Sequence, residues 1–441
     1  MIKVDGENKK VVGFICECNP FHRGHKRLIK EAKKYGDYIV AVMSGNFVQR
    51  GEPAVYDKYK RTKDLIKNGV DLVIELPIEY VMSSAKYFAY GGVKILNELG
   101  IVDYIIFGSK IADIEKLKKI ALINIDTANE KKSGSTIKKY LKEGKTYAYA
   151  TGKMLGEKLS SNDILAVEYI RALNEIKSSV EPITIERKND LPTASECREK
   201  IKKKITCDTF SNILNYKLLL AKTLKENSGS SDFSNIYLMT NDMENVVLKS
   251  QSSKLKNNLS FTERAKRIKT KNITLAYIKR LFFNIIFDIR KNDVEVDNEE
   301  KYKNYCDKED LNVSKKSPIK NNMLSKNVRY IRVLGFRKES KNILRQIKIP
   351  ILMSYAPTSY KSYLKMINKN HENNLSILQN KTNSLKKCDG ENLSNELVVC
   401  KNKKGEYELS PVLQKNIFAN DLYYYLSNQK LCEAERQVVV V

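Results

Sequence analysis

Short, almost wholly apolar runs recur along the first 200 residues, and each is followed by a stretch with helical spacing. Such runs are typical of strands buried on both faces, as in a parallel sheet covered by helices. The alternation therefore predicts an α/β, Rossmann-like domain over residues 1–205. The expected strands are residues 11–16, 38–43, 72–76, 104–107 and 183–187, and the expected helices are residues 24–35, 58–68, 85–99, 161–176 and 194–204.

The composition changes after about residue 205. Three segments rich in Lys, Asn and Ser contain too few apolar residues for a core and are expected to be long loops or insertions. They cover about residues 222–235, 291–327 and 366–408, and helical spacing returns between them at residues 274–288, 328–347 and 421–426. The sequence thus predicts a mainly helical region over residues 206–441.

The chain has 441 residues, and its formal net charge is +27. Such an excess favours a polyanionic partner, first of all a nucleic acid, although a composition rich in Lys and Asn is an alternative cause. The basic strips at residues 200–204 and 264–280 are the expected RNA contacts, because phosphate binding by such strips does not depend on base sequence.

Neither secretion nor membrane insertion is indicated by the sequence. The apolar run at residues 11–16 is too short for a signal peptide, and no run approaches the roughly 20 apolar residues of a membrane span. Eight cysteines are scattered without a CxxC pair, which argues against a zinc site. We therefore expect a cytoplasmic protein with reduced thiols, no membrane partner and no protein-bound metal.

The segment NPFHRGH, residues 19–25, directly follows the first expected strand. Asn-Pro favours a turn, and a glycine lets a ligand approach the backbone. His22 and His25 are three residues apart, so they share a face at a helix start, where free backbone N–H groups attract phosphate. Two imidazoles there can stabilise the charge that builds up at an α-phosphate. A capping turn with incidental histidines is the structural alternative.

A polar loop bounded by two glycines follows the second expected strand, at residues 44–53 (SGNFVQRGEP). It lies on the side of the sheet where ligands bind in such folds, so it suits a small-substrate pocket or lid. Arg50 can pair with a carboxylate or a phosphate there. Lys58 and Arg61 follow on one helix face, where we expect a solvated face, with RNA or phosphate contact as the alternative.

These motifs resemble those of a known enzyme family. NPFHRGH is similar to the HxGH motif of the nucleotidyltransferase superfamily, and residues 41–77 (AVMSGNFVQRGEPAVYDKYKRTKDLIKNGVDLVIELP) closely resemble the bacterial tRNA(Met) cytidine acetate ligase family. The resemblance continues at residues 83–100 and 161–173, and more weakly at residues 265–281 and 328–336. It covers most of the chain outside the predicted insertions.

The resemblance implies that acetate and ATP form acetyl-adenylate and pyrophosphate. The acetyl group then passes to the exocyclic amine of the wobble cytidine of elongator tRNA(Met), which gives N4-acetylcytidine. ATP is a substrate, Mg²⁺ is expected with it, and His22 and His25 take the catalytic role. The implied ATP-binding residues are Ile15, Cys16, Glu17, Cys18, Asn19, Pro20, Phe21, His22, Arg23, Gly24, His25, Lys26, Arg27, Leu28, Gly108, Asn162 and Arg187.

The later positions of this set suit an ATP site, and each has a structural alternative. Gly108 ends a strand where a nucleotide must approach the backbone, or it is a turn glycine. Asn162 can bind an adenine edge or a ribose hydroxyl, or it caps a helix. Arg187 can bind phosphate through two hydrogen bonds, or it is a surface charge. Arg198 is a further candidate phosphate contact, in a stretch (residues 193–198) that departs from the superfamily's Ser/Thr-rich phosphate motif.

Two other functions fit the same motifs. An adenylyltransferase acting on a small phosphorylated metabolite would attach AMP covalently to its product, but such enzymes are usually shorter and lack a large basic helical region. A non-catalytic RNA-binding relative would bind RNA without turning over ATP, and the altered stretch at residues 193–198 is the feature that favours it.

Overall fold

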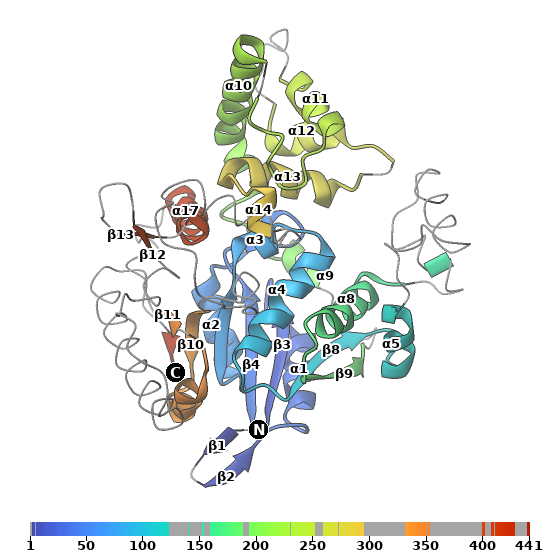
Figure 1. Ribbon diagram of the computed structural model, residues 1–441, viewed down its shortest axis with the longest axis vertical. Coiled ribbons are helices and arrows are strands. Elements are labelled where there is room, and N and C mark those ends of the chain that lie inside the picture. The colour runs from blue at the N-terminus through green and yellow to red at the C-terminus, as the bar shows by residue number, and fades with distance from the viewer. Residues whose placement is uncertain are drawn as a thin grey trace, which may run out of the picture.

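A computed structural model describes residues 2–4, 6–122, 159–187, 194–229, 231–251, 259–271, 273–294, 331–349, 351–352 and 411–427, with short pieces at 140, 152–153, 399–401, 407–409 and 439–441. A central sheet carries helices on both faces, and a group of helices from the second half of the chain lies above one end of the strands (Figure 1). That end is the one at which the parallel strands finish, so the helical group faces the expected ligand side of the sheet.

The central sheet has eight strands in the order β11-β10-β7-β4-β3-β8-β9, with β14 beside β10. Strands β3, β4, β7, β8 and β9 run parallel, and β10 is antiparallel to β7. The predicted α/β class is therefore confirmed. The bounds are β3 (Val11–Cys16), β4 (Tyr38–Ser44), β7 (Leu72–Leu76), β8 (Tyr104–Ser109), β9 (Glu181–Glu186), β10 (Ile331–Phe336), β11 (Ile351–Leu352) and β14 (Val439–Val440).

The crossover helices divide between the two faces of the sheet, as right-handed connections require. On one face α4 packs on α8, and Gly92 of α4 lies so close to Ile15 that a Cβ would come within 2.5 Å of its side chain. The other face carries α1 and α2, and Gly36 after α1 lies against Val12. The bounds are α1 (Arg23–Ala32), α2 (Lys58–Lys67), α3 (Ile78–Val81), α4 (Ala85–Glu98), α5 (Ile114–Leu122) and α8 (Ser161–Glu175).

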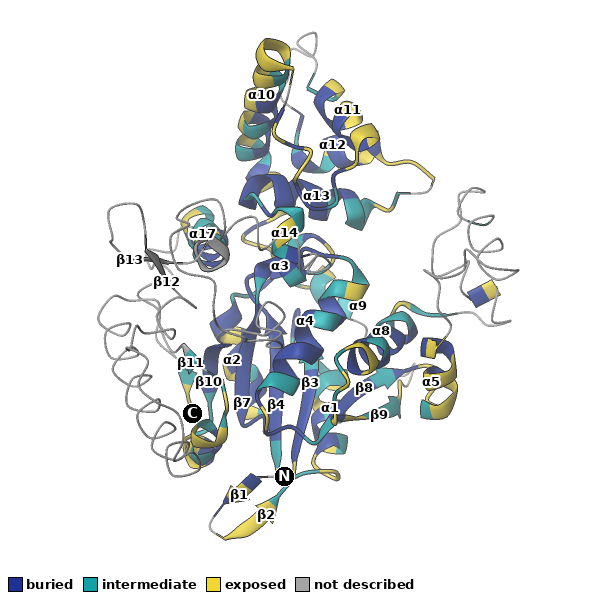
Figure 2. Cartoon of the chain, in the orientation of Figure 1, coloured by how far each residue is buried: buried dark blue, intermediate teal, exposed yellow. Residues whose placement is uncertain are grey.

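Burial is concentrated in the strands and in one helix of the second half, α13 (Leu275–Phe287) (Figure 2). Residues 274–288 were expected to be helical, and α13 confirms this for residues 275–287, most of which are buried. Thr274 caps this helix by accepting a hydrogen bond from the Tyr277 backbone N–H over 3.2 Å. Within the part of the chain that the structure describes, no helix is long and apolar enough to cross a membrane.

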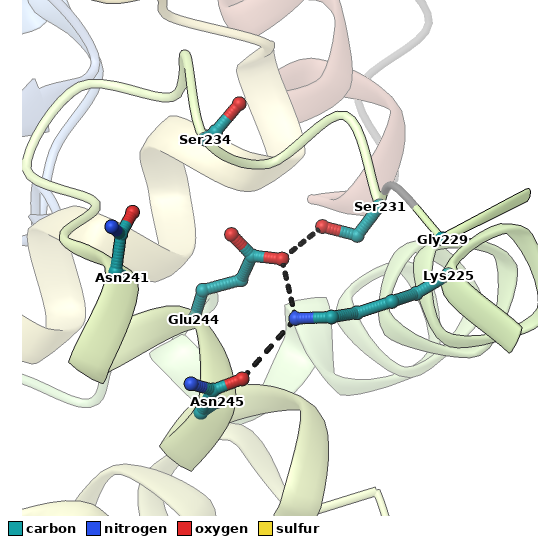
Figure 3. Close-up of a pocket in the computed structure, with 7 residues that line it drawn as sticks. All are labelled: Lys225, Gly229, Ser231, Ser234, Asn241, Glu244 and Asn245. Atoms are coloured by element: carbon teal, nitrogen blue, oxygen red, sulfur yellow. Dashed lines mark hydrogen bonds and ion pairs between the residues drawn. The ribbon is translucent and has the colours of Figure 1, made fainter.

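The helical group has an aromatic core and polar links between its helices. Phe261 packs against Phe282 and Phe283 at ring-centroid distances of 5.1 and 5.0 Å. The Lys225 ammonium lies 2.9 Å from the Glu244 carboxylate, beside a polar cavity of about 250 Å³ (Figure 3). The other bounds here are α9 (Ala194–Glu199), η1 (Cys207–Phe210), α10 (Ser211–Ser228), α11 (Asn241–Lys249), α12 (Phe261–Ile268) and α14 (Lys291–Val294).

The last helix, α17, returns to the sheet domain. The backbone N–H of Ile78 donates to the Asn416 side chain over 2.8 Å, and the Tyr423 hydroxyl donates to the Ala54 carbonyl over 3.1 Å. The C-terminal part of the chain is therefore built into the domain that the N-terminal part forms. The remaining bounds are α17 (Pro411–Leu426), η3 (Lys338–Gln346), β1 (Ile2–Val4), β2 (Glu7–Lys9), β12 (Val399–Lys401) and β13 (Tyr407–Leu409).

Several predictions of local structure are wrong. Residues 328–347 were predicted to be helical, but residues 331–336 form the buried strand β10, because they pair with β7. The predicted loop at 222–235 begins as helix, since α10 continues to Ser228 and ends at Gly229, which has a positive φ of 75°. The helix expected over 194–204 ends at Glu199. Most of the predicted insertions at 291–327 and 366–408 lies outside the described residues.

Candidate active site

The site begins where β3 leaves the sheet. The chain turns at Cys18, which adopts a positive φ of 46°, and passes through a cis Asn19–Pro20 bond. The Asn19 side chain accepts a hydrogen bond from the backbone N–H of Val55 over 2.8 Å, so this turn is fixed to the loop that follows β4. It leads directly into α1, whose N-cap residue is His22.

Backbone N–H groups at the helix start fix the tautomers of both histidines. Nδ1 of His22 accepts from the Gly24 backbone N–H over 3.0 Å, and Nδ1 of His25 accepts from the His22 backbone N–H over 3.3 Å. Because Nδ1 is the acceptor in both neutral rings, Nε2 carries the proton in both. The ring centroids are 4.0 Å apart. The pair therefore presents two N–H donors at a helix N-terminus, as the motif predicted.

Both imidazoles are neutral at neutral pH. Burial lowers the pKa of His25 to about 3, helped by the charges of His22 and Arg187. The pKa of His22 is lowered by burial first, and then by Arg187 and Arg198. The histidines are therefore suited to donate hydrogen bonds to an anion, and they do not carry a fixed positive charge in the free protein.

Local packing explains why residue 24 is a glycine, and the sequence alone did not reveal this. A Cβ at this position would lie 2.8 Å from Cε1 of His22, which is closer than real Cβ atoms approach other heavy atoms. The glycine was expected to let a ligand approach the backbone, but what it makes room for in this structure is the His22 ring. The spacing of the HxGH motif thus follows from the packing of its first histidine.

The carboxyl ends of β8 and β9 form the opposite wall. Gly108 lies in β8, and a Cβ there would meet no atom within 4 Å, so its face is open. The backbone N–H of Arg187 donates to the Ser109 carbonyl over 3.0 Å, which places Arg187 beside the end of β8. Asn162 was weighed as a helix cap, but the cap of α8 is Ser160, in a capping box with Asp163. The Asn162 side chain is therefore not required for capping.

Arg187 and Arg198 lie near the histidines, and Arg50 lies near both of these arginines. The pKa of Arg187 and that of Arg198 are both lowered, by burial first and then by the positive charge of Arg50. Arg198 is held by hydrogen bonds from Nη1 to the Asn19 carbonyl and from Nη2 to the Ser195 hydroxyl, both over 2.9 Å. Like charges this close disfavour one another, and a bound polyanion would relieve that repulsion.

A carboxylate also borders the site. Glu17 accepts a hydrogen bond through Oε1 from the Gln49 backbone N–H over 2.6 Å. Burial raises the pKa of Glu17, and this hydrogen bond and the nearby charges of Arg50 and Arg61 oppose the rise. Glu17 therefore ties the end of β3 to the polar loop at residues 44–53. That loop is a small hairpin of β5 (Phe47–Val48) and β6 (Glu52–Pro53).

Lys58 and Arg61 were expected on a solvated helix face, and that prediction is wrong. Both side chains are fully buried. Arg61 donates from Nη1 to the Glu17 carbonyl over 2.6 Å and to the Ser44 carbonyl over 3.1 Å, so it joins the ends of β3 and β4. Lys58 forms an ion pair with Glu75 of β7 at 2.7 Å. The signal that could have revealed this was Glu75 itself, an acid inside an otherwise apolar strand.

The other residues of the predicted ATP-binding stretch differ in how far they are buried. Phe21 stacks on His25 at a centroid distance of 5.6 Å. Cys16, Cys18 and Pro20 are buried and shape the turn, and Ile15 and Leu28 pack against the core. Arg23 and Lys26 are exposed on α1, and Arg27 is half-buried. The structure thus brings His22, His25, Arg50, Arg187 and Arg198 together, while the binding roles of all these residues stay predictions.

Comparison with known proteins decides the family. The HIGH Nucleotidyl Transferase family model matches residues 9–202 and 191–307. The tRNA(Met) cytidine acetate ligase of Thermoanaerobacter sp. (strain X514) is 35% identical over 404 residues, which cover 81% of this chain and 92% of the relative. The chain belongs to the tRNA(Met) cytidine acetate ligase family. The Fervidobacterium nodosum member is 34% identical, over 78% of this chain and 83% of its own.

The fold of this ligase family member also matches a solved structure. The crystal structure of Thermotoga maritima TmcAL bound with alpha-thio ATP has a TM-score of 0.68 and 23% sequence identity, and the match covers 98% of this chain and 99% of that one. This likeness concerns the fold. The curated ligases show the family, and the likeness to this structure confirms the α/β architecture that the sequence predicted.

Proposed function

We propose that this protein activates acetate with ATP and transfers the acetyl group to the wobble cytidine of elongator tRNA(Met) in the cytoplasm. The observation that carries the proposal is the presence of two neutral imidazoles at the N-terminus of α1, with the guanidinium groups of Arg187 and Arg198 close to His22. It is supported by relatives that are named tRNA(Met) cytidine acetate ligase. In this proposal ATP supplies the polyanion, and acetate supplies the nucleophile.

The first half-reaction needs positioning and charge stabilisation. An acetate oxygen attacks the α-phosphorus, the bond to the bridging oxygen of the β-phosphate breaks, and pyrophosphate leaves with the bonding electrons. No general base is needed, because acetate, like other carboxylates, is already ionised at neutral pH. The Nε2–H groups of His22 and His25 donate to the oxygens on which charge builds up, and Arg187 and Arg198 hold the phosphate chain.

The second half-reaction moves the acetyl group to RNA. The exocyclic amine of cytidine attacks the carbonyl carbon of acetyl-adenylate, the bond from that carbon to the AMP oxygen breaks, and the amine loses a proton. The same donors that stabilise the first transition state then stabilise the negative charge of the departing AMP. The open face at Gly108, together with Asn162, is the proposed position of the adenosine.

Mg²⁺ is expected to arrive on the ATP phosphates. Among the described residues, no group of three His, Cys, Asp or Glu side chains could hold a metal ion. The imidazole and guanidinium groups at this site do not suit Mg²⁺, whereas phosphate oxygens do. The Glu17 carboxylate, which borders the site, already accepts a hydrogen bond from the Gln49 backbone N–H. The ion would supply charge neutralisation on the phosphates, and the protein would hold it indirectly through the nucleotide.

Exposed lysines and arginines from residue 202 onward are the proposed RNA contacts. Residues 202–204 and Lys266, Arg267 and Lys269 are exposed. By contrast, Arg264 and Arg280, at the two ends of the basic strip that the sequence suggested, are buried and cannot reach an RNA backbone. The proposed RNA surface is therefore narrower than the strip at residues 264–280.

The test is acetate-dependent exchange of pyrophosphate into ATP, followed by transfer of labelled acetate to tRNA(Met). The proposal predicts exchange that requires acetate, and one acetyl group on the wobble cytidine, which mass analysis of the RNA detects. ATP turnover that ignores acetate would overturn it. A product carrying covalently attached AMP would instead identify an adenylyltransferase acting on a small metabolite.

A further inference from the structure

The tip of the β5–β6 hairpin, residues 48–52, rests on helix α13 of the helical group. The Lys279 ammonium lies 2.5 Å from the Glu52 carboxylate, and Nη1 of Arg280 donates to the Gln49 carbonyl over 2.8 Å. Gly51 has a positive φ of 71°, and a Cβ there would lie 2.7 Å from the Arg280 backbone nitrogen. The tip is thus in direct contact with the backbone of α13, which only a glycine permits.

The base of the same hairpin is held by aromatic side chains from beyond residue 205. Phe47 packs against Phe283 and Phe287 of α13 at centroid distances of 5.1 and 4.9 Å, and against Phe210 at 5.7 Å. All four rings are buried. The helical group therefore fixes both the tip and the base of a loop that belongs, in sequence, to the nucleotide-binding half.

These contacts determine where Arg50 lies. The Gln49 carbonyl belongs to the peptide group that leads into Arg50, and the Gln49 N–H is held by Glu17 over 2.6 Å. With Arg280 on the carbonyl and Glu17 on the N–H, the backbone before Arg50 is fixed on both sides. Arg50 itself is exposed and has a long side chain. Its positive charge nevertheless contributes to lowering the pKa of both Arg187 and Arg198.

Arg280 is an unusual residue for a purely structural position. Its side chain is only 8% exposed, and its Nε atom is buried with no hydrogen-bond partner in the described structure. Burial of a guanidinium group is costly, and an apolar side chain of similar size would pack there at lower cost. What the arginine provides, and what an apolar residue cannot, is the hydrogen bond to the carbonyl before Arg50.

We propose that Lys279 and Arg280 are positioning residues for acetate activation, which seat the hairpin tip so that Arg50 faces the phosphate and acetate site. This inference rests on the proposed function. It means that the helical group completes the site of the first half-reaction, in addition to binding RNA. Loss of the contacts that Lys279 and Arg280 make with the hairpin tip should therefore impair acetate activation even when no RNA is present.

The experiment measures acetate-dependent pyrophosphate exchange by the full chain without RNA, for Arg280→Met, Arg50→Gln and the double variant. The matched control is Arg264→Met. Arg264 is also buried, donates to the Ser250 carbonyl over 2.6 Å and has an unpartnered Nε, but it lies in α12 and makes no hydrogen bond to the hairpin. Both arginine-to-methionine variants disturb the helical group, and only one of them releases the tip.

We expect Arg280→Met to lower kcat/KM for acetate at least tenfold, and Arg264→Met to leave it within about twofold of the parent, a difference of more than ~1 kcal/mol. Arg50→Gln should show a similar loss, and adding Arg280→Met to it should cause little further loss, because both act through Arg50. Where Arg280→Met does not fold, Glu52→Gln is the substitute, because it removes the ion pair between Lys279 and the hairpin tip. It should also reduce pyrophosphate exchange.

Three results would overturn the inference: unchanged exchange in Arg280→Met, an equal loss in Arg264→Met, or losses that multiply in the double variant. Each of them leaves the parent's acetate-dependent exchange intact and so leaves the proposed function standing. Absence of that exchange in the parent would instead overturn the proposed function itself.

Discussion

Nδ1 of His25 accepts a hydrogen bond from the backbone N–H of His22 over 3.3 Å. This contact closes a capping box, because the His22 ring at the same time accepts from the Gly24 N–H. One local arrangement therefore begins the helix and leaves the Nε2–H of both rings free of the hydrogen bonds that cap it. The motif combines a structural and a chemical role, which had seemed to be alternatives in the sequence.

The lowered pKa of His25 predicts a specific sensitivity to acid. Below about pH 6.5 the unfolded chain takes up a proton at this residue, whereas the folded protein does so only near pH 3. The unfolded state then binds more protons, so this histidine makes the free energy of unfolding fall as the pH drops through that window. Urea unfolding at several pH values should show a shallower fall for His25→Asn than for the parent. Parallel curves would contradict the prediction.

The buried ion pair between Lys58 and Glu75 predicts a large stability effect. The two side chains are 0% and 4% exposed, so Lys58→Met leaves a buried carboxylate without its partner. We expect a loss of about 3–5 kcal/mol in the free energy of unfolding, measured with a denaturant, and a smaller loss when Glu75→Leu is added.

The exposed pair Lys60–Asp64, on the same helix, is the matched control. Its side chains are 49% and 33% exposed and 3.3 Å apart. Lys60→Met should cost less than about 1 kcal/mol, because solvent screens such pairs. Similar losses at the two sites would show that burial does not make the Lys58–Glu75 pair more important for the free energy of unfolding.

The sheet and the histidine site were predictable from the sequence because their signals are local. Strands β3, β4, β7 and β8 are each a nearly continuous apolar run, and the two histidines lie within one short motif after the first run. Strand β10 was mistaken for helix because its partner, β7, lies in the first hundred residues, and nothing local records that pairing. Residue spacing within β10 could not reveal a strand that is buried on both faces.

The parts of the site that could not be predicted depend on contacts between distant segments. The carbonyl of Gln49 is bonded by Arg280, and the carbonyl of Glu17 by Arg61. In the sequence, a buried arginine that binds carbonyl groups looks the same as one on a solvated helix. For this reason Arg61 was assigned to the surface and Arg280 to an RNA-binding strip, and both are buried.

Gly108→Ala tests whether a nucleotide approaches the end of β8. A Cβ there meets no atom within 4 Å, so the variant should fold with a melting temperature close to that of the parent. If adenosine lies against this face, the added methyl group should weaken ATP binding roughly tenfold, measured by calorimetry. Unchanged ATP affinity would place the nucleotide elsewhere.

The role of the histidine pair is tested most directly by His25→Ala in two assays on the same preparation. If its Nε2–H stabilises the α-phosphate during adenylation, acetate-dependent pyrophosphate exchange should fall by about 10² to 10³, as when one preorganised donor to a developing oxyanion is removed. The dissociation constant for tRNA(Met) should stay within about twofold, and Lys30→Ala, an exposed position on the same helix, should leave both unchanged. Equal losses of exchange and of tRNA affinity in His25→Ala, or full exchange without this histidine, would contradict the account.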